Sequence, residues 1–129
     1  MQHYSQEELR LEAKLVIGEN IDIDDEGYIE PELALWRFKE NFNVKDLLPL
    51  MGTKEEFQSW WDDEVLTLSE VRDDCYFNDL LSNEIREPVI ITIIDSRIYV
   101  WDGWHRIAAS VISGKATIPA IYAVPSDIA

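Results

Sequence analysis

The N-terminal segment has the hydrophobic pattern of a short amphipathic helix. Apolar side chains recur at roughly helical spacing over residues 5–17. Ser5 and Glu8 have the spacing of a capping box, which satisfies the first amide groups of a helix. Gly18 suits the end of that helix. The next segment, 19–27, is rich in acidic residues and is expected to form a loop or a short exposed strand.

Two further helices are predicted in the acidic first half of the chain. A proline in the first turn and the apolar and aromatic positions after it favour a helix over residues 30–41. A hydrophobic connector is expected over 43–52. A second capping-box pair, Thr53 and Glu56, then begins a third helix, and the acidic run 62–64 is expected to end it.

From about residue 65 the pattern becomes typical of alternating strands and helices. Residues 65–71 alternate apolar and polar side chains and predict a short strand. A helix is expected to open at Asp73 or Asp74. The β-branched run over 89–94 is the most strongly predicted strand of the chain.

The C-terminal segment predicts a hairpin, a helix and a closing strand. A turn at residues 95–96 leads into a second hairpin strand over 97–101. A helix over 107–112 is expected to stop at Gly114, before a final strand over 120–124. This order of elements predicts an α+β or α/β protein whose helices pack against one sheet.

The composition fits one compact unit. The chain has 129 residues, of which 47% are hydrophobic, and this is enough for a single core. We expect an acidic helical extension over 1–64 packed on a domain over 65–129. The longest apolar run is far shorter than the roughly 18 residues that span a bilayer, so a soluble, cytoplasmic protein is expected. The single cysteine, Cys75, predicts neither an intramolecular disulfide nor a zinc-ligand pair.

The net charge of −15 is concentrated in the first part of the chain. Residues 1–80 hold 21 of the 26 acidic residues and 7 of the 11 basic ones. Nucleic acids and anionic membranes should repel such a surface, so neither direct DNA binding nor a membrane partner is expected. The charge either keeps the protein soluble or forms an acidic surface that meets a basic partner or imitates a nucleic acid backbone.

Candidate chemistry is concentrated where the second hairpin strand meets the following helix, at Trp-Asp-Gly-Trp-His-Arg, residues 101–106. A helix that begins directly after a strand presents free amide groups and the positive end of its dipole to an anion. Gly103 permits positive φ or the close approach of a phosphate oxygen. His105 and Arg106 add donors, and Asp102 could orient one of them or hold a cation through water. The same Asp-Gly pair is also a common turn signal.

This part of the chain resembles the ParB/sulfiredoxin superfamily over residues 68–124. The features that carry the resemblance follow the family's order: a strand over 98–101, the turn over 102–106, small residues over 107–109, Gly114, and a closing strand over 118–124. The resemblance implies an α+β fold with a small mixed sheet. It also implies that the turn binds nucleotide phosphates through Gly103, His105 and Arg106, and Trp104 completes the cofactor-binding set. The cofactor expected from the resemblance is ATP, ADP or CTP with Mg²⁺.

The branches of this family differ in their reactive residues. Sulfiredoxin-like repair uses a cysteine within the turn, and Trp104 stands there in this chain, which excludes that reaction. The chromosome-partitioning branch has a glutamate in the turn that this chain lacks. A third branch resembles free-serine kinases, in which an acidic residue acts as base. Glu87 or Asp102 fits that catalytic role, although both also fit solvated or capping carboxylates.

The sequence therefore supports two hypotheses of different classes. The first is a nucleotide-binding protein that hydrolyses or transfers phosphate, with Trp101 or Trp104 stacked on the base and the other indole packed under the sheet. The second is a non-enzymatic interaction protein, encoded by a phage or mobile element, whose acidic first half engages a basic protein surface. An antitoxin or immunity-type protein would bind a basic partner through the same kind of acidic surface.

Overall fold

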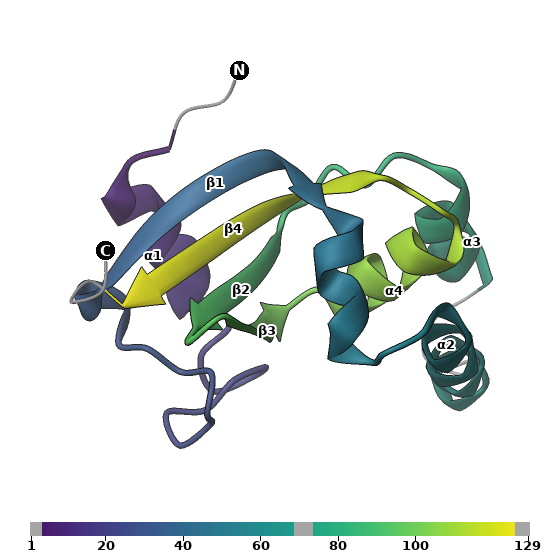
Figure 1. The fold of residues 1–129 in the computed structure, drawn as a ribbon, viewed down its shortest axis with the longest axis horizontal. Helices are drawn as coiled ribbons and strands as arrows, with labels where there is room; N and C mark the ends of the chain where they lie inside the picture. Colours follow the sequence, from purple (N-terminus) through teal and green to yellow (C-terminus); the bar gives the residue numbers. More distant parts are fainter. Residues whose placement is uncertain (1–3, 69–73, 126–129) are drawn as a thin grey trace.

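A four-stranded mixed sheet forms the centre of the molecule (Figure 1). The computed structural model describes residues 4–68 and 74–125. The strand order in the sheet is β1-β4-β2-β3. The strands are β1 (Ala34–Asn43), β2 (Val89–Ile94), β3 (Arg97–Asp102) and β4 (Thr117–Pro125). The β1–β4 and β2–β3 pairs are antiparallel, whereas β2 and β4 are parallel.

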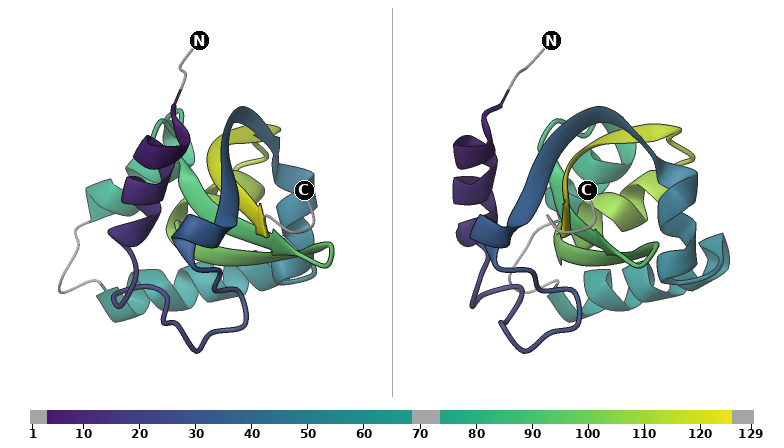
Figure 2. Two further views of the ribbon diagram at one scale, coloured as in Figure 1. Left: turned by 90° about the vertical axis from the view of Figure 1, so that its left-hand side faces the viewer. Right: turned by 60° about the vertical axis from the view of Figure 1, so that its left-hand side comes forward.

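Helices cover both faces of the sheet (Figure 2). The described helices are α1 (Gln6–Lys14), α2 (Lys54–Leu68), α3 (Asp74–Ser82) and α4 (Trp104–Ile112), with 3-10 turns η1 (Pro31–Leu33) and η2 (Val44–Leu50). α1 lies on one side of the sheet, and α4 lies on the other with α2 and α3 outside it. Within the two described segments, no helix combines the length and apolar character needed to cross a membrane.

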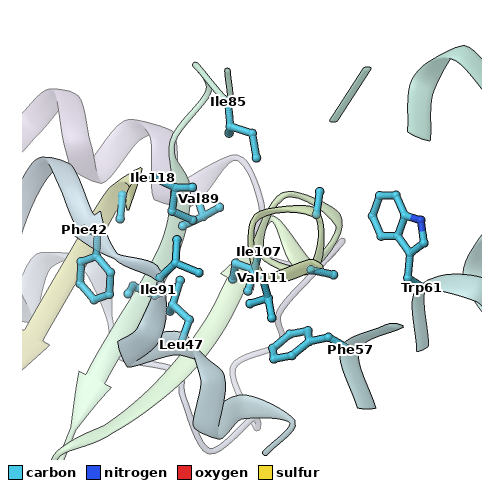
Figure 3. Close-up of a cluster of buried hydrophobic side chains, with 14 of the residues drawn as sticks. Phe42, Leu47, Phe57, Trp61, Ile85, Val89, Ile91, Ile107, Val111 and Ile118 are labelled. Atoms are coloured by element: carbon cyan, nitrogen blue, oxygen red, sulfur yellow. The ribbon is translucent and has the colours of Figure 1, made fainter. Parts of the chain in front are cut away.

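The larger core lies between the sheet, α4 and α2. Val89 and Ile91 of β2 point into it and are fully buried. Figure 3 shows Ile107 of α4 between these strand residues and Phe57 of α2. α4 is thus a buried central helix, and this fixes the position of its first turn.

A second core lies on the opposite face of the sheet. Ile90 of β2 points into it, as period-two alternation requires, and packs with Trp36, Trp101 and Leu9 of α1. Both faces of β2 are therefore buried, which explains why the sequence of this strand is continuously apolar. Gln6 of α1 hydrogen-bonds both backbone groups of Trp36, so its amide side chain covers the outer edge of β1.

Several sequence-based predictions are confirmed. The fold class is α+β, and β2 and β3 form the predicted hairpin. Asp95 and Ser96 both have positive φ, 51° and 67°, as a tight two-residue hairpin turn requires. The capping box of Ser5 and Glu8 is present at the start of α1, which ends at Lys14 rather than at residue 17.

The predicted helix over residues 30–41 is wrong. The chain makes the short turn η1 and then forms β1, which pairs with β4 along most of its length. Ala34 and Trp36 are buried while Arg37 is exposed, so the apolar positions follow the two-residue period of a strand. The acidic first part of the chain therefore contributes a strand to the sheet as well as helices.

The predicted end of the third helix at 62–64 is also wrong, because α2 continues to Leu68. Phe57, Trp61 and Val65 repeat every four residues and keep one apolar face through the acidic run. The strand predicted over 65–71 is replaced by helix as far as Leu68, and its remaining residues lie outside the described part of the chain. The connector predicted over 43–52 contains the 3-10 turn η2.

α3 begins at Asp74, one of the two predicted starts, while Asp73 lies outside the described residues. The last two elements, α4 and β4, are longer than predicted. α4 begins at Trp104, three residues before the predicted helix, and β4 begins at Thr117. As a result, Trp104, His105 and Arg106 occupy the first helical turn rather than a loop before it.

Candidate functional site

The turn between β3 and α4 has a geometry that requires glycine. Gly103 precedes α4 with φ 111° and ψ 24° and makes no side-chain cap. A Cβ atom at this position would lie 2.5 Å from Cγ1 of the buried Val89. The first helical bond runs from the Ile107 amide to the Gly103 carbonyl at 2.9 Å. The amides of residues 104–106 precede that bond and therefore face the turn, as at any helix N-terminus.

A cleft of about 690 Å³ opens at this turn, a size typical of small-molecule sites. Its walls come from the loop after α1, from α2 and α3, and from the β3–α4 turn. The rings of Trp60 and Trp104 line it with their centroids 6.1 Å apart. All six sequence-predicted site residues line this one cleft: Glu87, Asp102, Gly103, Trp104, His105 and Arg106.

Arg106 is largely tied to the protein itself. Its Nη1 donates to the carbonyl oxygens of Pro88 (2.8 Å) and Glu87 (3.2 Å), and its Nη2 donates to Asp102 Oδ2 (3.0 Å). The side chain is only 16% exposed. These bonds use three of the five donors of a guanidinium group. Arg106 therefore holds the turn against the segment before β2, with part of its donor capacity left for a ligand.

The two predicted carboxylates have different surroundings. Asp102 accepts from Arg106 through Oδ2 and from Asn20 Nδ2 through Oδ1, at 3.0 Å each. This geometry matches the orienting role predicted for Asp102. Glu87 lies at the rim with its side chain 89% exposed and its Oε2 3.8 Å from Arg106 Nη1. Of the two, Glu87 is the carboxylate with room to meet a ligand or a cation.

His105 points toward α2 and α3, away from the partners of Arg106. Its Nδ1 lies 3.1 Å from the Tyr76 hydroxyl, and its Nε2 lies 3.3 Å from Glu64 Oε1. The side chain is 19% exposed. The sequence predicts His105 and Arg106 as joint phosphate contacts. The structure places both on one cleft but directs their donor groups to different neighbours.

Aromatic rings enclose the imidazole of His105. Its centroid lies 5.5 Å from that of Trp60, 6.2 Å from Trp61, 5.8 Å from Tyr76 and 5.7 Å from Phe77. These rings come from α2 and α3, so the position of His105 depends on the packing of both helices against α4. The enclosure restricts the imidazole to few orientations.

The charge of the cleft is negative. Among the described residues, Glu19, Glu64, Glu87 and Asp102 line it, and Arg106 is the one guanidinium that does so. In the described residues, no group of three or more histidine, cysteine or acidic side chains is arranged to hold a metal ion. A cation that accompanies a polyanionic ligand would offset this negative charge.

Sequence reasoning missed the cleft residues contributed by the two outer helices. Glu64, Trp60 and Tyr76 belong to α2 and α3 and are far from the turn in sequence. One weak signal was present, since Trp60 and Glu64 are four residues apart and so share a helix face. That spacing alone could not indicate that the face meets His105.

The fold and the cleft define the class of this protein: a three-layer α+β domain with a ligand-sized cleft at a strand-to-helix turn. Comparisons with known protein families, with curated proteins and with solved structures gave no match. The chemistry of the cleft and the motif of its turn are therefore the features that indicate a function.

Proposed function

We propose that this chain is a ParB/sulfiredoxin-like protein that binds a nucleotide with Mg²⁺ in the Gly103 cleft and hydrolyses or transfers its phosphate. The observation that carries the proposal is the first turn of α4. This helix begins without a side-chain cap at a glycine with positive φ and opens into a cleft that contains two indole rings. The hairpin, turn, helix and closing strand also follow the order that the sequence resemblance implies, which supports the proposal.

The phosphate end of the ligand fits the helix N-terminus. The amides of residues 104–106 point toward the turn, and the helix dipole adds partial positive charge there. The space beside the Cα of Gly103 is filled by Val89, so the glycine sets the turn directly against β2 and fixes the direction of these amides. Arg106 contributes its remaining donors and keeps the turn in place. In this arrangement the backbone supplies most of the contacts.

The base end of the ligand fits the aromatic wall. Trp101 is 1% exposed and packs in the second core, so it is the indole that lies under the sheet. Trp104 is partly exposed and lines the cleft opposite Trp60. Stacking of a base on an aromatic side chain contributes about 1–3 kcal/mol. Trp104 is therefore the residue proposed to stack on the base.

The carboxylates of the cleft make Mg²⁺ part of the proposal. In the described part of the chain, four carboxylates and one guanidinium line the cleft, a balance that repels free phosphates. A divalent cation bound to the phosphates reverses that repulsion. Mg²⁺ is commonly held by substrate phosphates with one or two protein carboxylates, so a preformed cage is not required. Glu87, exposed at the rim, is the carboxylate that can reach such a cation.

Calorimetric titration tests this proposal. We expect ATP, ADP or CTP to bind in the presence of Mg²⁺ and to bind at least tenfold more weakly in EDTA. Trp104→Leu should weaken binding about 5- to 150-fold, which corresponds to the loss of about 1–3 kcal/mol of stacking. Tyr4→Leu, on the far side of the sheet, should leave the affinity unchanged. Absence of heat with millimolar Mg²⁺-nucleotide would contradict the proposal.

The charge distribution favours a second candidate, an acidic interaction protein. Exposed carboxylates crowd the loop after α1, at Asp22, Asp24, Asp25 and Glu26. A basic protein partner held by this surface should bind more weakly as salt rises and should still bind the Trp104→Leu variant. This candidate would be contradicted if the amount of captured partner changed neither with salt nor when the four loop carboxylates are replaced by amides.

A further inference from the structure

We infer that Glu64, His105 and Tyr76 form a hydrogen-bonded triad that activates the Tyr76 hydroxyl as a nucleophile in the cleft. The three residues come from α2, α4 and α3, and all line the same 690 Å³ space. The Tyr76 hydroxyl is a reactive group that the turn motif does not contain. The inference rests on the proposed function only for the natural substrate, the terminal phosphoryl group of a nucleotide.

The distances fit one tautomer of a neutral imidazole. Such a ring has one donor nitrogen and one acceptor nitrogen. If Nε2–H donates to Glu64 Oε1 (3.3 Å), then Nδ1 is free to accept from the Tyr76 hydroxyl (3.1 Å). After proton transfer, the imidazolium donates to both neighbours without any rearrangement. The same geometry therefore stabilises both the start and the end of the transfer, as in a carboxylate–histidine–hydroxyl triad.

The surroundings of His105 support this role. The Trp60 ring lies 5.5 Å from the imidazole at an interplanar angle of 35°, and Phe77 and Trp61 enclose it edge-on. Rings at these distances hold the imidazole in place, and an aromatic face attracts a cation electrostatically. An imidazolium formed by proton transfer thus has both a carboxylate and an aromatic face beside it.

The triad lies next to the proposed phosphate site. His105 is the second residue of α4, so its backbone amide belongs to the anion-facing turn while its ring contacts Tyr76. In the proposed step, the Tyr76 oxygen attacks the terminal phosphorus of the nucleotide and its proton moves to His105 Nδ1. A bond forms between that oxygen and phosphorus, and the bond from phosphorus to its bridging oxygen breaks. The nucleotide leaves one phosphate shorter, with the electron pair on that oxygen, and Tyr76 becomes a phosphotyrosine.

Tyr28 provides an internal control. Its hydroxyl donates to Glu30 Oε2 at 2.9 Å and has a carboxylate neighbour but no imidazole in that bond. Burial, followed by the hydrogen bond and charge of Glu30, raises the pKa of Tyr28 above its ordinary value. At a given pH, Tyr28 therefore forms less phenolate than a tyrosine with the ordinary pKa. We expect its hydroxyl to react more slowly than the hydroxyl of Tyr76.

A nucleotide-free labelling experiment tests the triad. An aryl sulfonyl fluoride reacts with an activated tyrosine: the oxygen attacks sulfur, fluoride leaves, and the phenolic proton passes to the neighbouring base. Peptide mass spectrometry of the full chain should show Tyr76 labelled at least tenfold faster than Tyr28. Glu64→Gln, which retains a hydrogen-bonding side chain, should slow labelling of Tyr76 about tenfold and leave Tyr28 unchanged. Equal rates at the two tyrosines, or no effect of Glu64→Gln, would overturn the inference.

A second measurement separates this inference from the proposed function. With γ-³²P-ATP and Mg²⁺, the label should appear on Tyr76 and be lost in Tyr76→Phe, which should bind the nucleotide within twofold of wild type. Fast sulfonyl labelling without nucleotide binding would support the triad and contradict the proposed function. Nucleotide binding without selective labelling of Tyr76 would support the proposed function and overturn the triad.

Discussion

Replacement of Gly103 by alanine is expected to lower the free energy of unfolding by about 2–6 kcal/mol. Two costs combine: the left-handed backbone, about 1–3 kcal/mol, and overpacking, about 1–3 kcal/mol. The backbone cost arises because φ is 111°. The packing cost arises because the new Cβ would lie 2.5 Å from Val89 Cγ1 and 2.9 Å from Val89 Cβ. Val89 is fully buried in the larger core and has no room to retreat.

Gly114→Ala is the matched control for this prediction. Gly114 also has positive φ, 75°, but a Cβ there would meet no atom within 4 Å. Only the backbone cost applies, so we expect a loss of about 1–2 kcal/mol. Urea unfolding of both variants measures the difference. If Gly103→Ala and Gly114→Ala destabilise the protein equally, the close contact between the turn and β2 is not present in solution.

Replacement of Trp101 by alanine should cost about 3–5 kcal/mol, the range for a buried aromatic residue. Trp101 is 1% exposed. It stacks on Tyr28 with centroids 5.6 Å apart and meets Trp36 edge-on at 5.5 Å. Its Nε1 also donates to the Gly27 carbonyl at 3.0 Å. Trp101 therefore joins the acidic loop to the strand that leads into the site.

Two further variants divide the Trp101 effect into its parts. Trp101→Phe keeps a ring but loses the N–H donor, and should cost about 1 kcal/mol for the hydrogen bond, with a further packing loss below that of alanine. Trp60→Ala, at the partly exposed wall of the cleft, should cost clearly less than Trp101→Ala because less apolar surface is lost. Unfolding monitored by circular dichroism gives all three values. A larger loss for Trp60→Ala than for Trp101→Ala would contradict the described cores.

The parts of the fold that depend on local pattern could be predicted from the sequence. The hairpin of β2 and β3 follows from a β-branched run, a two-residue turn and a second strand, all within neighbouring residues. The start of α1 follows from the capping pair Ser5 and Glu8. In these segments the hydrogen-bond partners are close in sequence, so the pattern contains most of the information.

The parts of the fold that depend on partners distant in sequence could not be predicted from the sequence. β1 exists because Trp36 pairs with Ala123 in β4 and because Gln6 covers its outer edge. The sequence of residues 30–41 does not indicate either partner. Its aromatic spacing after a proline also fits a helix. Tertiary pairing determined the outcome, as is usual for strand formation.

The candidate site shows the same division. The turn residues Gly103, His105 and Arg106 were identified because strand-to-helix turns have a recognisable chemistry. Their neighbours were not, since Glu64 and Tyr76 reach the cleft only through the packing of α2 and α3 against α4. The direction of the His105 side chain follows from those neighbours and lay beyond what spacing could indicate.

Amide chemical shifts recorded by NMR during titration with Mg²⁺-ATP test the proposed nucleotide site most directly. We predict that the largest shifts fall on the backbone amides of Trp104, His105 and Arg106 and on the indole N–H of Trp104. The indole N–H of Trp36, buried on the other face of the sheet, should stay in place. Shifts that leave residues 104–106 unmoved while others change, or no shifts at all, would contradict a nucleotide site at the first turn of α4.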